Sequence, residues 1–314
     1  MPRQPDAPGM HGVLVVAKPA GPTSHDVVAL VRRLASTRRI GHGGTLDPFA
    51  SGVLPLFLGG ATRLVEYHLA DDKAYRATIC FGATSTTDDL DGDLTPREPA
   101  GGEGPGRAEV EEALSGFVGP QLQRPPVYSA VQVGGRRAYA MARAGEEVDL
   151  PARSVEIRSL QLVEWDAADP ARPIAIVDVV CTAGTYVRAL ARDLGEHLGC
   201  GAYLGALVRT ASGPFTLDRA RTLDALRDAA ADAGPDGIRA LLLPADYGLD
   251  ALPAVALTDP EIADALQGRY VRPSGGLRGA GDAGPLRLVD AAGTIVGMGR
   301  REGARVAPTK MLPR

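Results

Sequence analysis

The chain has 314 residues, of which 45% are hydrophobic and 23% are charged. This length fits one large domain or two, and this composition excludes a chain that is disordered throughout. No stretch reaches the roughly 18 apolar residues of a membrane-spanning helix, and residues 1–6 lack the hydrophobic segment of a secretory signal. The three cysteines are odd in number and far apart, and the five histidines are scattered. We therefore expect a cytoplasmic protein with no disulfide framework, no metal site and no membrane segment.

The net charge of −4 is unevenly distributed along the chain. Residues 71–112 hold eleven acidic and four basic side chains, whereas residues 18–44 hold five basic side chains and one acidic one. Local rather than total charge attracts a phosphate backbone. The negative total therefore does not exclude a nucleic acid as partner.

The first sixty residues predict two short strands around one helix. Ser24 is expected to cap the helix, and Val27, Leu30, Val31 and Leu34 follow helical spacing on one apolar face. The segment after the helix fits neither the helical nor the strand period. In chain order, the predicted elements are a disordered tail over residues 1–10, a buried strand over 12–17, a turn over 18–24, a helix over 25–35, an ordered loop over 40–52 and a strand over 53–58.

The middle of the chain predicts further strands, one polar loop and the clearest helix of the sequence. Residues 73–81 alternate as a strand and place Tyr75 on its apolar face. Residues 88–107 are acidic and rich in glycine and proline, which predicts a solvated loop. Asp89 begins a stretch that resembles a calcium loop, but Leu94 stands where the sharp-turn glycine belongs. The later elements are strands over 155–164 and 174–181 and a helix over 185–199.

The sequence pattern changes near Pro244, which predicts a second, smaller domain. A short helix capped by Thr258 or Asp259 is followed by strands over 286–290 and 294–298, joined by a hairpin. Glycines at 279, 281 and 284 match a dinucleotide fingerprint by letter, but no strand precedes them and Pro285 follows, so we interpret them as a loop.

Arg188 breaks a local rule. If Thr185 caps the helix, Arg188 occupies the third helical position, where the helix dipole favours an anion, and Arg192 adds a like charge one turn later. Either Arg188 is an exposed surface arginine, or it extends away from its own helix to an anion.

Asp47 lies in a loop that carries several glycines, which allow a ligand to approach the backbone closely. The Asp-Pro pair is also a common turn former, so Asp47 either caps its own turn or serves as a lone nucleophile or base. By residue type alone, Tyr75 is a core aromatic and His42 is an ordinary loop residue. These observations lead to a candidate anion–cation pair but to no reaction.

Six segments follow one another between residues 12 and about 217: Lys18-Pro-Ala-Gly-Pro-Thr-Ser24, Gly41-His-Gly-Gly-Thr-Leu-Asp47, Lys73-Ala-Tyr75-Arg-Ala, Gln123-Arg-Pro-Pro-Val-Tyr128, Cys181-Thr-Ala-Gly-Thr-Tyr186-Val-Arg188 and Leu207-Val-Arg-Thr-Ala-Ser-Gly-Pro-Phe215. They resemble the motifs of the TruB-type pseudouridine synthases, and their combination is highly specific. This family isomerises uridine 55 in the T-loop of tRNA.

The resemblance implies an α+β fold: a central mixed, largely antiparallel sheet flanked by helices, the pseudouridine synthase fold, over residues 11–245. It also implies a small β-rich, PUA-like RNA-binding domain over residues 250–310. Two features depart from the family pattern. Gln132 stands where the family usually has lysine, and the acidic segment over residues 88–107 is longer than is common.

The resemblance also implies the site. Asp47 is expected to be the catalytic carboxylate, Arg188 its partner, and Tyr75 the residue that stacks on the uracil and helps to remove its C5 proton. The implied partner is the T-stem-loop of tRNA, with no cofactor, no metal and no obligate protein partner, and with a monomeric enzyme. The expected substrate-binding residues are His42, Tyr186, Lys18 and Leu207, and the expected phosphate contacts are Arg32, Arg33, Arg38, Arg39, Arg136 and Arg137.

Three other functions remain open at the level of sequence. A hydrolase that uses Asp47 at the same anomeric carbon ordinarily needs a second carboxylic acid, and none appears in the motifs. A non-catalytic RNA chaperone would not depend on Asp47. A relative that modifies ribosomal RNA would require a guide RNA and protein partners.

Overall fold

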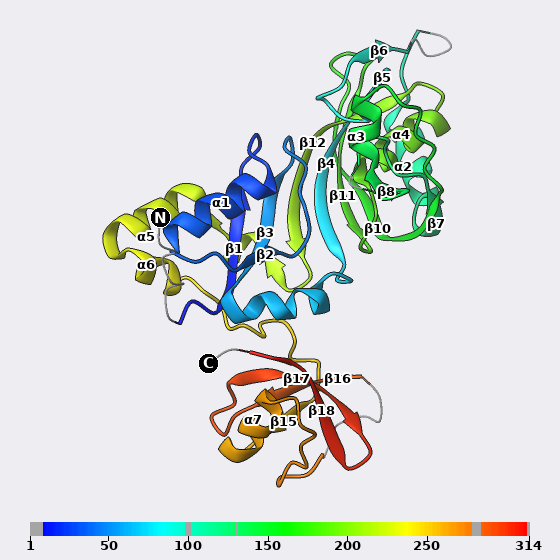
Figure 1. The fold of residues 1–314 in the computed structure, drawn as a ribbon. Helices are drawn as coiled ribbons and strands as arrows, with labels where there is room; N and C mark the ends of the chain where they lie inside the picture. The colour runs from blue at the N-terminus through cyan, green and yellow to red at the C-terminus, as the bar shows by residue number, and fades with distance from the viewer. Residues whose placement is uncertain (1–8, 98–101, 130, 278–283, 313–314) are drawn as a thin grey trace.

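The structure is a computed structural model that describes residues 9–97, 102–129, 131–277 and 284–312 (Figure 1). None of the helices in these ranges is long and apolar enough to cross a membrane. The predicted tail over residues 1–10 lies largely outside them. Met10, however, is buried in the main core, so the ordered chain begins before the predicted end of the tail.

A ten-stranded sheet forms the centre of the larger part of the molecule. Its backbone order is β14-β1-β3-β12-β4-β11-β10-β7, with β2 paired to β3 and β13 to β12. The pairs β1–β14 and β3–β12 are parallel and the other pairs are antiparallel. The predicted mixed, largely antiparallel sheet is therefore confirmed. The strands are β1 (Gly12–Lys18), β2 (Ile40–His42), β3 (Ser51–Leu58), β4 (Lys73–Phe81), β7 (Gly119–Gln123), β10 (Arg153–Asp166), β11 (Ile174–Cys181), β12 (Ala202–Ser212), β13 (Phe215–Thr216) and β14 (Arg221–Thr222).

Two groups of helices flank the two ends of this sheet (Figure 1). The first group accompanies β1 and β3, and the second accompanies β10 and β7. Two short ribbons, β5 (Ala83–Ser85) with β6 (Leu94–Pro96) and β8 (Gln132–Val133) with β9 (Arg136–Arg137), complete this part. The helices are α1 (Ser24–Leu34), α5 (Leu223–Ala233) and α6 (Pro235–Arg239) in the first group and α2 (Arg107–Gly116), α3 (Ala138–Arg143) and α4 (Val187–His197) in the second, with 3-10 helices η1 (Gly59–His68) and η2 (Leu217–Arg219).

Strand β12 joins the two halves of the sheet. It pairs in parallel with β3 through Val208 and Arg209, and antiparallel with β4 along most of its length. Gly52 of β3 is required at this seam: its φ is +107°, and a Cβ there would lie 2.2 Å from the carbonyl oxygen of Arg209. The seam brings the loop before β3 against β4 and β12, and this is where the cleft forms.

Helix α1 extends over the predicted range, but its cap is Thr23 rather than Ser24. The Thr23 hydroxyl accepts a hydrogen bond from the Asp26 amide at 3.1 Å, and the Asp26 carboxylate accepts one from the Thr23 amide at 2.9 Å, which makes a capping box. Ser24 holds the loop before β3 instead: its hydroxyl donates to the Leu46 carbonyl at 3.0 Å and accepts from the Leu46 amide at 2.9 Å.

Helix α4 begins later than predicted. Its N-cap is Tyr186 and not Thr185, so Arg188 occupies the second helical position. Leu190, Ala191 and Leu194 are buried in the main core, as the apolar stripe predicted. The unfavourable placement of a cation in the first turn remains as the sequence indicated.

Two predicted loops contain more structure than expected. The loop over residues 40–52 begins with β2, whose residues pair with β3. The acidic segment over 88–107 is not a uniformly solvated loop, because Asp89 is buried and residues 94–96 form β6. Residues 98–101 of this segment lie outside the described ranges.

A separate four-stranded sheet forms the C-terminal part, as predicted. The capping box of its helix uses Thr258, and Gly268 follows the helix with a φ of +74°. The predicted hairpin joins β16 to β17, and most of the glycine-rich loop before β16 lies outside the described ranges. The elements are β15 (Ala254–Ala256), α7 (Asp259–Leu266), β16 (Pro285–Val289), β17 (Ile295–Glu302) and β18 (Arg305–Met311).

The C-terminal sheet packs against η1 of the larger part. Leu64 of η1 shares an apolar cluster with Leu249, Ile295, Met298 and Leu312. Arg63 also donates a hydrogen bond to the carbonyl of Met311. The boundary near residue 245 remains a prediction, as does the RNA-binding role of this sheet.

Candidate active site

A cleft of about 680 Å³ opens at the seam between β3, β4 and β12. Its walls come from segments far apart in sequence: the turn before α1, the glycine loop before β3, β4, the acidic segment, and the N-terminus of α4. The residues that line it include Asp47, Tyr75, Asp89, Tyr128, Tyr186, Arg188 and Arg209.

Asp47 and Arg188 meet on the wall of this cleft. One carboxylate oxygen of Asp47 lies 3.0 Å from Nη2 of Arg188. The Arg188 side chain is 6% exposed and the Asp47 side chain is 40% exposed, so the guanidinium is buried behind a carboxylate that faces the cleft. The arginine that breaks the rule for its helix therefore reaches an anion, and the aspartate of the glycine loop has a cationic partner.

Arg188 binds more than Asp47. Its Nη1 lies 3.1 Å from a carboxylate oxygen of Asp89 and donates to the Thr87 carbonyl at 3.1 Å. Its Nη2 donates to the Tyr128 carbonyl at 3.0 Å. A planar guanidinium with donors in fixed directions can hold these groups at once, which a lysine cannot do.

The environment of Asp47 acts on its pKa in opposite directions. Burial raises the pKa of the carboxyl group, the Arg188 guanidinium lowers it, and the like charge of Asp89 raises it; together they hold the pKa of Asp47 above its ordinary value. The ionised form, which a nucleophile or base requires, is thus reached at a higher pH than for an exposed aspartate.

Asp89 is the residue that sequence reasoning missed. Its side chain is only 5% exposed, and its carboxylate accepts hydrogen bonds from the Asp91 amide at 3.1 Å and from the Thr87 hydroxyl, besides its ion pair with Arg188. The sequence feature that points to Asp89 is the run of aspartates at 89, 91 and 93, which does not match a complete calcium loop. A second carboxylate therefore lies beside the Asp47–Arg188 pair, although none appears in the sequence motifs.

Lys18 supports the cleft from beneath and does not line it. Its side chain is buried, and its ammonium group donates to the carbonyls of Pro19, Pro48 and Ala50 at 2.9, 3.2 and 2.7 Å. Burial lowers its pKa to about 8. Two of its three donors bind the loop that carries Asp47 and the third binds the adjacent Pro19, so the structure gives Lys18 a role in holding that loop, and its contact with substrate stays a prediction.

Tyr75 lines the cleft from β4, and Arg209 of β12 donates a hydrogen bond to it. Arg209 is 2% exposed, and its guanidinium also donates to the carbonyls of Val53, Thr45 and Gly44 at 2.7, 3.3 and 3.1 Å. Burial raises the pKa of Tyr75, so its hydroxyl stays protonated at neutral pH. Arg209 lies in the last of the six sequence segments, but it was not predicted as a site residue. The sequence does indicate it, because an arginine within a buried strand is rare.

Tyr186 and Leu207 lie on the cleft wall, in agreement with their predicted positions. The histidines differ from expectation: His25 of α1 lines the cleft, whereas His42 is half-buried, with its ring centroid 5.8 Å from that of His25. Burial, His25 and Arg209 lower the pKa of His42, so its ring is neutral at pH 7. Its predicted role in filling the stack of a flipped base remains a prediction.

The arginines expected to contact phosphate divide into two groups. Those near α1 are exposed, whereas Arg136 is engaged by Glu146 through two hydrogen bonds of 2.8 and 2.7 Å. The side chain of Arg137 is outside what the structure describes. The exposed members of the first group are Arg32, Arg33, Arg38 and Arg39.

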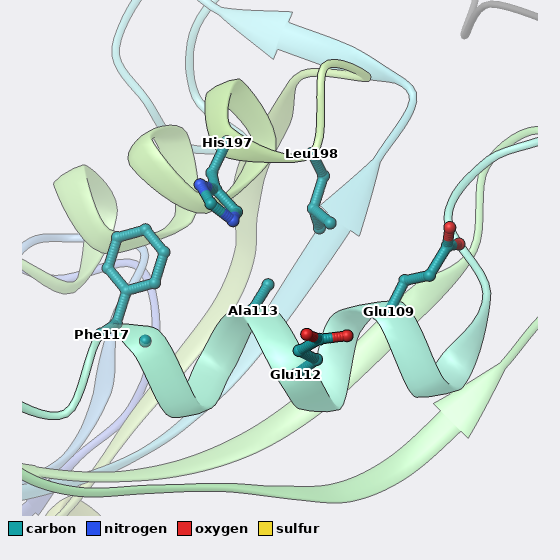
Figure 2. A pocket seen from close by; sticks show the side chains of 7 residues that line it. Glu109, Glu112, Ala113, Phe117, His197 and Leu198 are labelled. Carbon is teal, nitrogen blue, oxygen red and sulfur yellow. The ribbon is translucent and has the colours of Figure 1, made fainter.

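A second hollow, of about 540 Å³, lies between α2 and α4 (Figure 2). Glu109 and Glu112 of α2 line it together with Phe117, His197 and Leu198. Its carboxylates disfavour an RNA backbone on this face. Across the described ranges, no three histidine, cysteine, aspartate or glutamate side chains are placed to hold a metal ion.

Comparison with known proteins identifies the family. Residues 32–187 match the model of the TruB family pseudouridylate synthase N-terminal domain. Residues 188–250 match the tRNA pseudouridylate synthase B C-terminal domain, and residues 253–312 match the C-terminal model of pseudouridine synthase II TruB.

Individual relatives agree with these matches. The tRNA pseudouridine synthase B of Parasynechococcus marenigrum is 45% identical over 94% of each chain, and that of Thiobacillus denitrificans is 42% identical over 98% of each chain. Among solved structures, an archaeal box H/ACA Nop10–Cbf5 complex contains a chain that is 25% identical, with a TM-score of 0.69, over 96% of this chain and 86% of that one.

By fold and by site, the chain is a pseudouridine synthase, an isomerase. It belongs to the TruB family.

Proposed function

We infer that this chain isomerises uridine to pseudouridine at position 55 in the T-loop of tRNA. The observation that carries this inference is the Asp47–Arg188 pair, 3.0 Å apart, on the wall of a cleft of about 680 Å³ that Tyr75 and Tyr186 also line. Family membership over nearly the whole chain supports the substrate, because the relatives named above are tRNA pseudouridine synthases.

The reaction breaks the bond between N1 of uracil and C1′ of ribose, and it forms a bond between C5 and C1′. The C5 proton leaves, N1 gains a proton, and no electron is transferred. The step therefore needs an ionised group in the cleft and a place for the base to turn. Asp47 supplies the first requirement, since Arg188 stabilises its carboxylate while the open side of that carboxylate faces the cleft.

Three routes are compatible with Asp47: attack on C1′, attack on the base, or removal of a ribose proton. All of them begin from the carboxylate form. Arg188 has its other donors bound to Asp89 and to backbone carbonyls, so its guanidinium cannot turn away when the charge of Asp47 is consumed. We assign Arg188 the role of holding Asp47 ionised and oriented.

Tyr75 is placed to stack on the uracil and to relay its C5 proton at the end of the reaction: the oxygen of the neutral phenol takes that proton as the hydroxyl gives its own to a water. The buried Arg209 is hydrogen-bonded to this oxygen and stabilises the partial negative charge that develops on it as the hydroxyl proton leaves. Tyr186 and Leu207 complete the wall beside the base.

The target base lies inside a folded RNA loop, so it must leave its stack before it can reach Asp47. Extrusion of a base costs a few kcal/mol, and stacking on aromatic side chains returns about 1–3 kcal/mol per base. Tyr75, Tyr128 and Tyr186 line the cleft and provide such surfaces. Phosphates of the stem are expected to meet the exposed arginines of α1 and the segment after it.

The test uses the purified chain alone with a T-loop hairpin that carries tritium at C5 of the target uridine. We expect release of tritium and, after digestion, pseudouridine at that position. The matched control is a hairpin whose target uridine is replaced by cytidine, which should release nothing.

Three other outcomes would contradict the inference. Free uracil would indicate a hydrolase; the second carboxylate that such an enzyme needs is present as Asp89, but Arg188, Thr87 and the Asp91 amide occupy its oxygens. Activity only after addition of a guide RNA and partner proteins would place the chain with the box H/ACA enzymes. Unchanged function after loss of Asp47 would indicate an RNA chaperone.

A further inference from the structure

Helix α4 carries a second arginine, Arg192, one turn after Arg188, and its guanidinium is fully engaged. Its Nη1 donates to a carboxylate oxygen of Asp88 at 2.9 Å, and its Nη2 donates to the carbonyl of Arg124 at 2.9 Å. Its Nε donates to Asp193 on the same helix at 2.9 Å. Arg192 and Asp88 are both partly buried, with 21% and 16% of their side chains exposed, and neither lines the cleft.

Arg188 and Arg192 repeat one arrangement along the helix. Each binds one of two consecutive aspartates, Arg188 with Asp89 and Arg192 with Asp88. Each also binds one backbone carbonyl of the segment 124–128, Tyr128 for Arg188 and Arg124 for Arg192. The helix thus holds the acidic segment and the segment 124–128 at two points, one turn apart.

The backbone at Asp88 is shaped for this arrangement. Side chains of consecutive residues in an extended chain point to opposite sides, so two adjacent aspartates cannot normally face one helix. Asp88 has a φ of +62°, a left-handed conformation that is uncommon outside glycine and that aspartate and asparagine tolerate. The Asp88 carbonyl and the Leu90 amide are fixed on both sides by hydrogen bonds of 3.0 Å to the backbone of Leu204 in β12.

We propose that the Arg192–Asp88 ion pair is a positioning element of the catalytic site. It holds the acidic segment so that Asp89 reaches Arg188, and it holds the segment 124–128 so that the Tyr128 carbonyl does the same. Arg188 then has one available orientation toward Asp47. Neither Arg192 nor Asp88 touches the substrate, and the proposal rests on the function inferred above for Asp47 and Arg188.

The test compares Asp88→Asn, Arg192→Gln and the double variant with the unaltered chain. Asparagine keeps the shape and the left-handed backbone of Asp88 and removes only its charge. Under single-turnover conditions with saturating enzyme, we expect each single variant to lower the rate of pseudouridine formation between about tenfold and a hundredfold, the loss associated with small misplacements of reacting groups. The dissociation constant for the hairpin should stay within about twofold. The double variant should be no slower than the slower single variant, because both changes break the same link.

The matched control is Asp178→Asn, which removes the carboxylate of the Arg76–Asp178 pair on the exposed face of the sheet, where the two hydrogen bonds are 2.9 and 2.8 Å. Its rate should be unchanged. Rates in folded Asp88→Asn and Arg192→Gln enzyme equal to that of the unaltered chain would overturn the proposal, as would losses that multiply in the double variant. If Arg192→Gln does not fold, Asp88→Asn and its control decide alone. Failure of the unaltered chain to form pseudouridine would instead count against the proposed function.

Discussion

Arg188 is one cation that serves two carboxylates. Asp47 lies 3.0 Å and Asp89 lies 3.1 Å from its terminal nitrogens, and the two aspartates differ sharply in exposure, at 40% and 5%. The buried Asp89 is held by several donors, whereas the cleft-facing Asp47 has Arg188 as its ion-pair partner. This difference supports the reactivity proposed for Asp47 and a structural role for Asp89.

Replacement of Asp47 by asparagine tests the reactive carboxylate. Asp47→Asn should lower pseudouridine formation by at least about 10³-fold, as losses of nucleophiles or essential bases do in other enzymes. Its affinity for the hairpin should be nearly unchanged, because the amide keeps the shape of the side chain. Single-turnover product formation and filter binding measure the two quantities. Asp47→Asn enzyme with substantial activity would defeat the assignment.

The stability of Asp47→Asn shows whether its loss of activity comes from lost chemistry or from a lost fold. Burial and Asp89 hold the pKa of Asp47 above its ordinary value, so the charge of Asp47 disfavours the folded state at neutral pH. Thermal unfolding should therefore show Asp47→Asn to be at least as stable as the unaltered chain, and a markedly lower Tm would show that the loss of activity is a loss of fold.

The rate should fall on the acid side as Asp47 becomes protonated, at a pH above the ordinary value for aspartate. Asp89 raises the pKa of Asp47, so its removal must lower that pKa. Asp89→Asn should therefore move the acid limb of the single-turnover pH profile to lower pH, even though the maximal rate also decreases. An acid limb that moves to higher pH, or does not move, would contradict the electrostatic account.

Residues that violated local rules could be predicted as site candidates from the sequence. Arg188 was conspicuous in the first turn of a helix, and Asp47 was conspicuous among glycines. Asp89 could not be predicted, since an aspartate in an acidic, glycine-rich segment has the composition of a solvated loop. Its long-range contacts with α4 and with Leu204 of β12 bury it. The contacts by which Lys18 holds the Asp47 loop could not be predicted for a similar reason, because two of the carbonyls that it binds belong to residues about 30 positions away.

At the scale of elements, the loop that carries Asp47 is held from two sides. The hydroxyl of Ser24 at the start of α1 exchanges two hydrogen bonds with Leu46, and Lys18 at the end of β1 binds the carbonyls of Pro48 and Ala50. The position of Asp47 therefore depends on residues of β1 and α1 that lie outside its own loop.

Loss of the Lys18 ammonium tests this support. Lys18→Met removes the ammonium donor from the carbonyls of Pro19 and Ala50, whereas the Pro48 carbonyl keeps the Gly21 amide at 2.8 Å. A buried carbonyl without a partner costs about 1–3 kcal/mol. The relief of a desolvated charge offsets part of this cost, so urea unfolding should show a net loss of about 1–3 kcal/mol. The single-turnover rate should fall as well, because the loop shifts. Lys310→Met is the control: Lys310 is an exposed partner of Glu66 at 3.4 Å, and its loss should change the free energy of unfolding by less than about 1 kcal/mol. Equal effects of the two variants would argue against the support.

Helices and strands with clear periodicity were predictable within a few residues, as for α1, β4 and β11. The N-terminal caps of helices were less predictable. The observed caps, Thr23 and Tyr186, each lie one residue from the predicted cap. The choice at α1 depends on Ser24 being engaged by Leu46, a contact between residues 22 positions apart that local spacing does not reveal.

At the scale of the whole molecule, the charges are segregated. The exposed arginines of α1 and the following segment lie on the part of the chain that supplies one side of the cleft, whereas the hollow between α2 and α4 is lined by glutamates. A net charge of −4 is therefore compatible with an RNA-binding face.

The salt dependence of RNA affinity measures this face. Removal of one arginine that binds a phosphate should reduce the slope of log affinity against log salt by about 0.7–0.9. Arg32→Ala with Arg33→Ala should reduce the slope accordingly, whereas Arg107→Ala on α2, paired with Glu111, should leave it unchanged. A flat salt response of the unaltered chain would argue against any binding of phosphates by this face.

The fold class could be inferred from resemblance, but the strand order could not be inferred from periodicity. Parallel pairing of β12 with β3 joins residues about 157 positions apart, and nothing local to either strand specifies it. Likewise, the packing of the C-terminal sheet on η1 joins Leu64 to residues near 250–312.

The late place of β12 in the chain has a consequence for synthesis. Asp47, Tyr75 and Arg188 have all been translated before residues 202–212, yet the seam on which they converge does not exist until that strand inserts between β3 and β4. A nascent polypeptide that ends before β12 carries the reactive groups on two unjoined half-sheets. We therefore expect a chain that ends before β12 to form no pseudouridine, since the cleft is complete only when the central strand is in place.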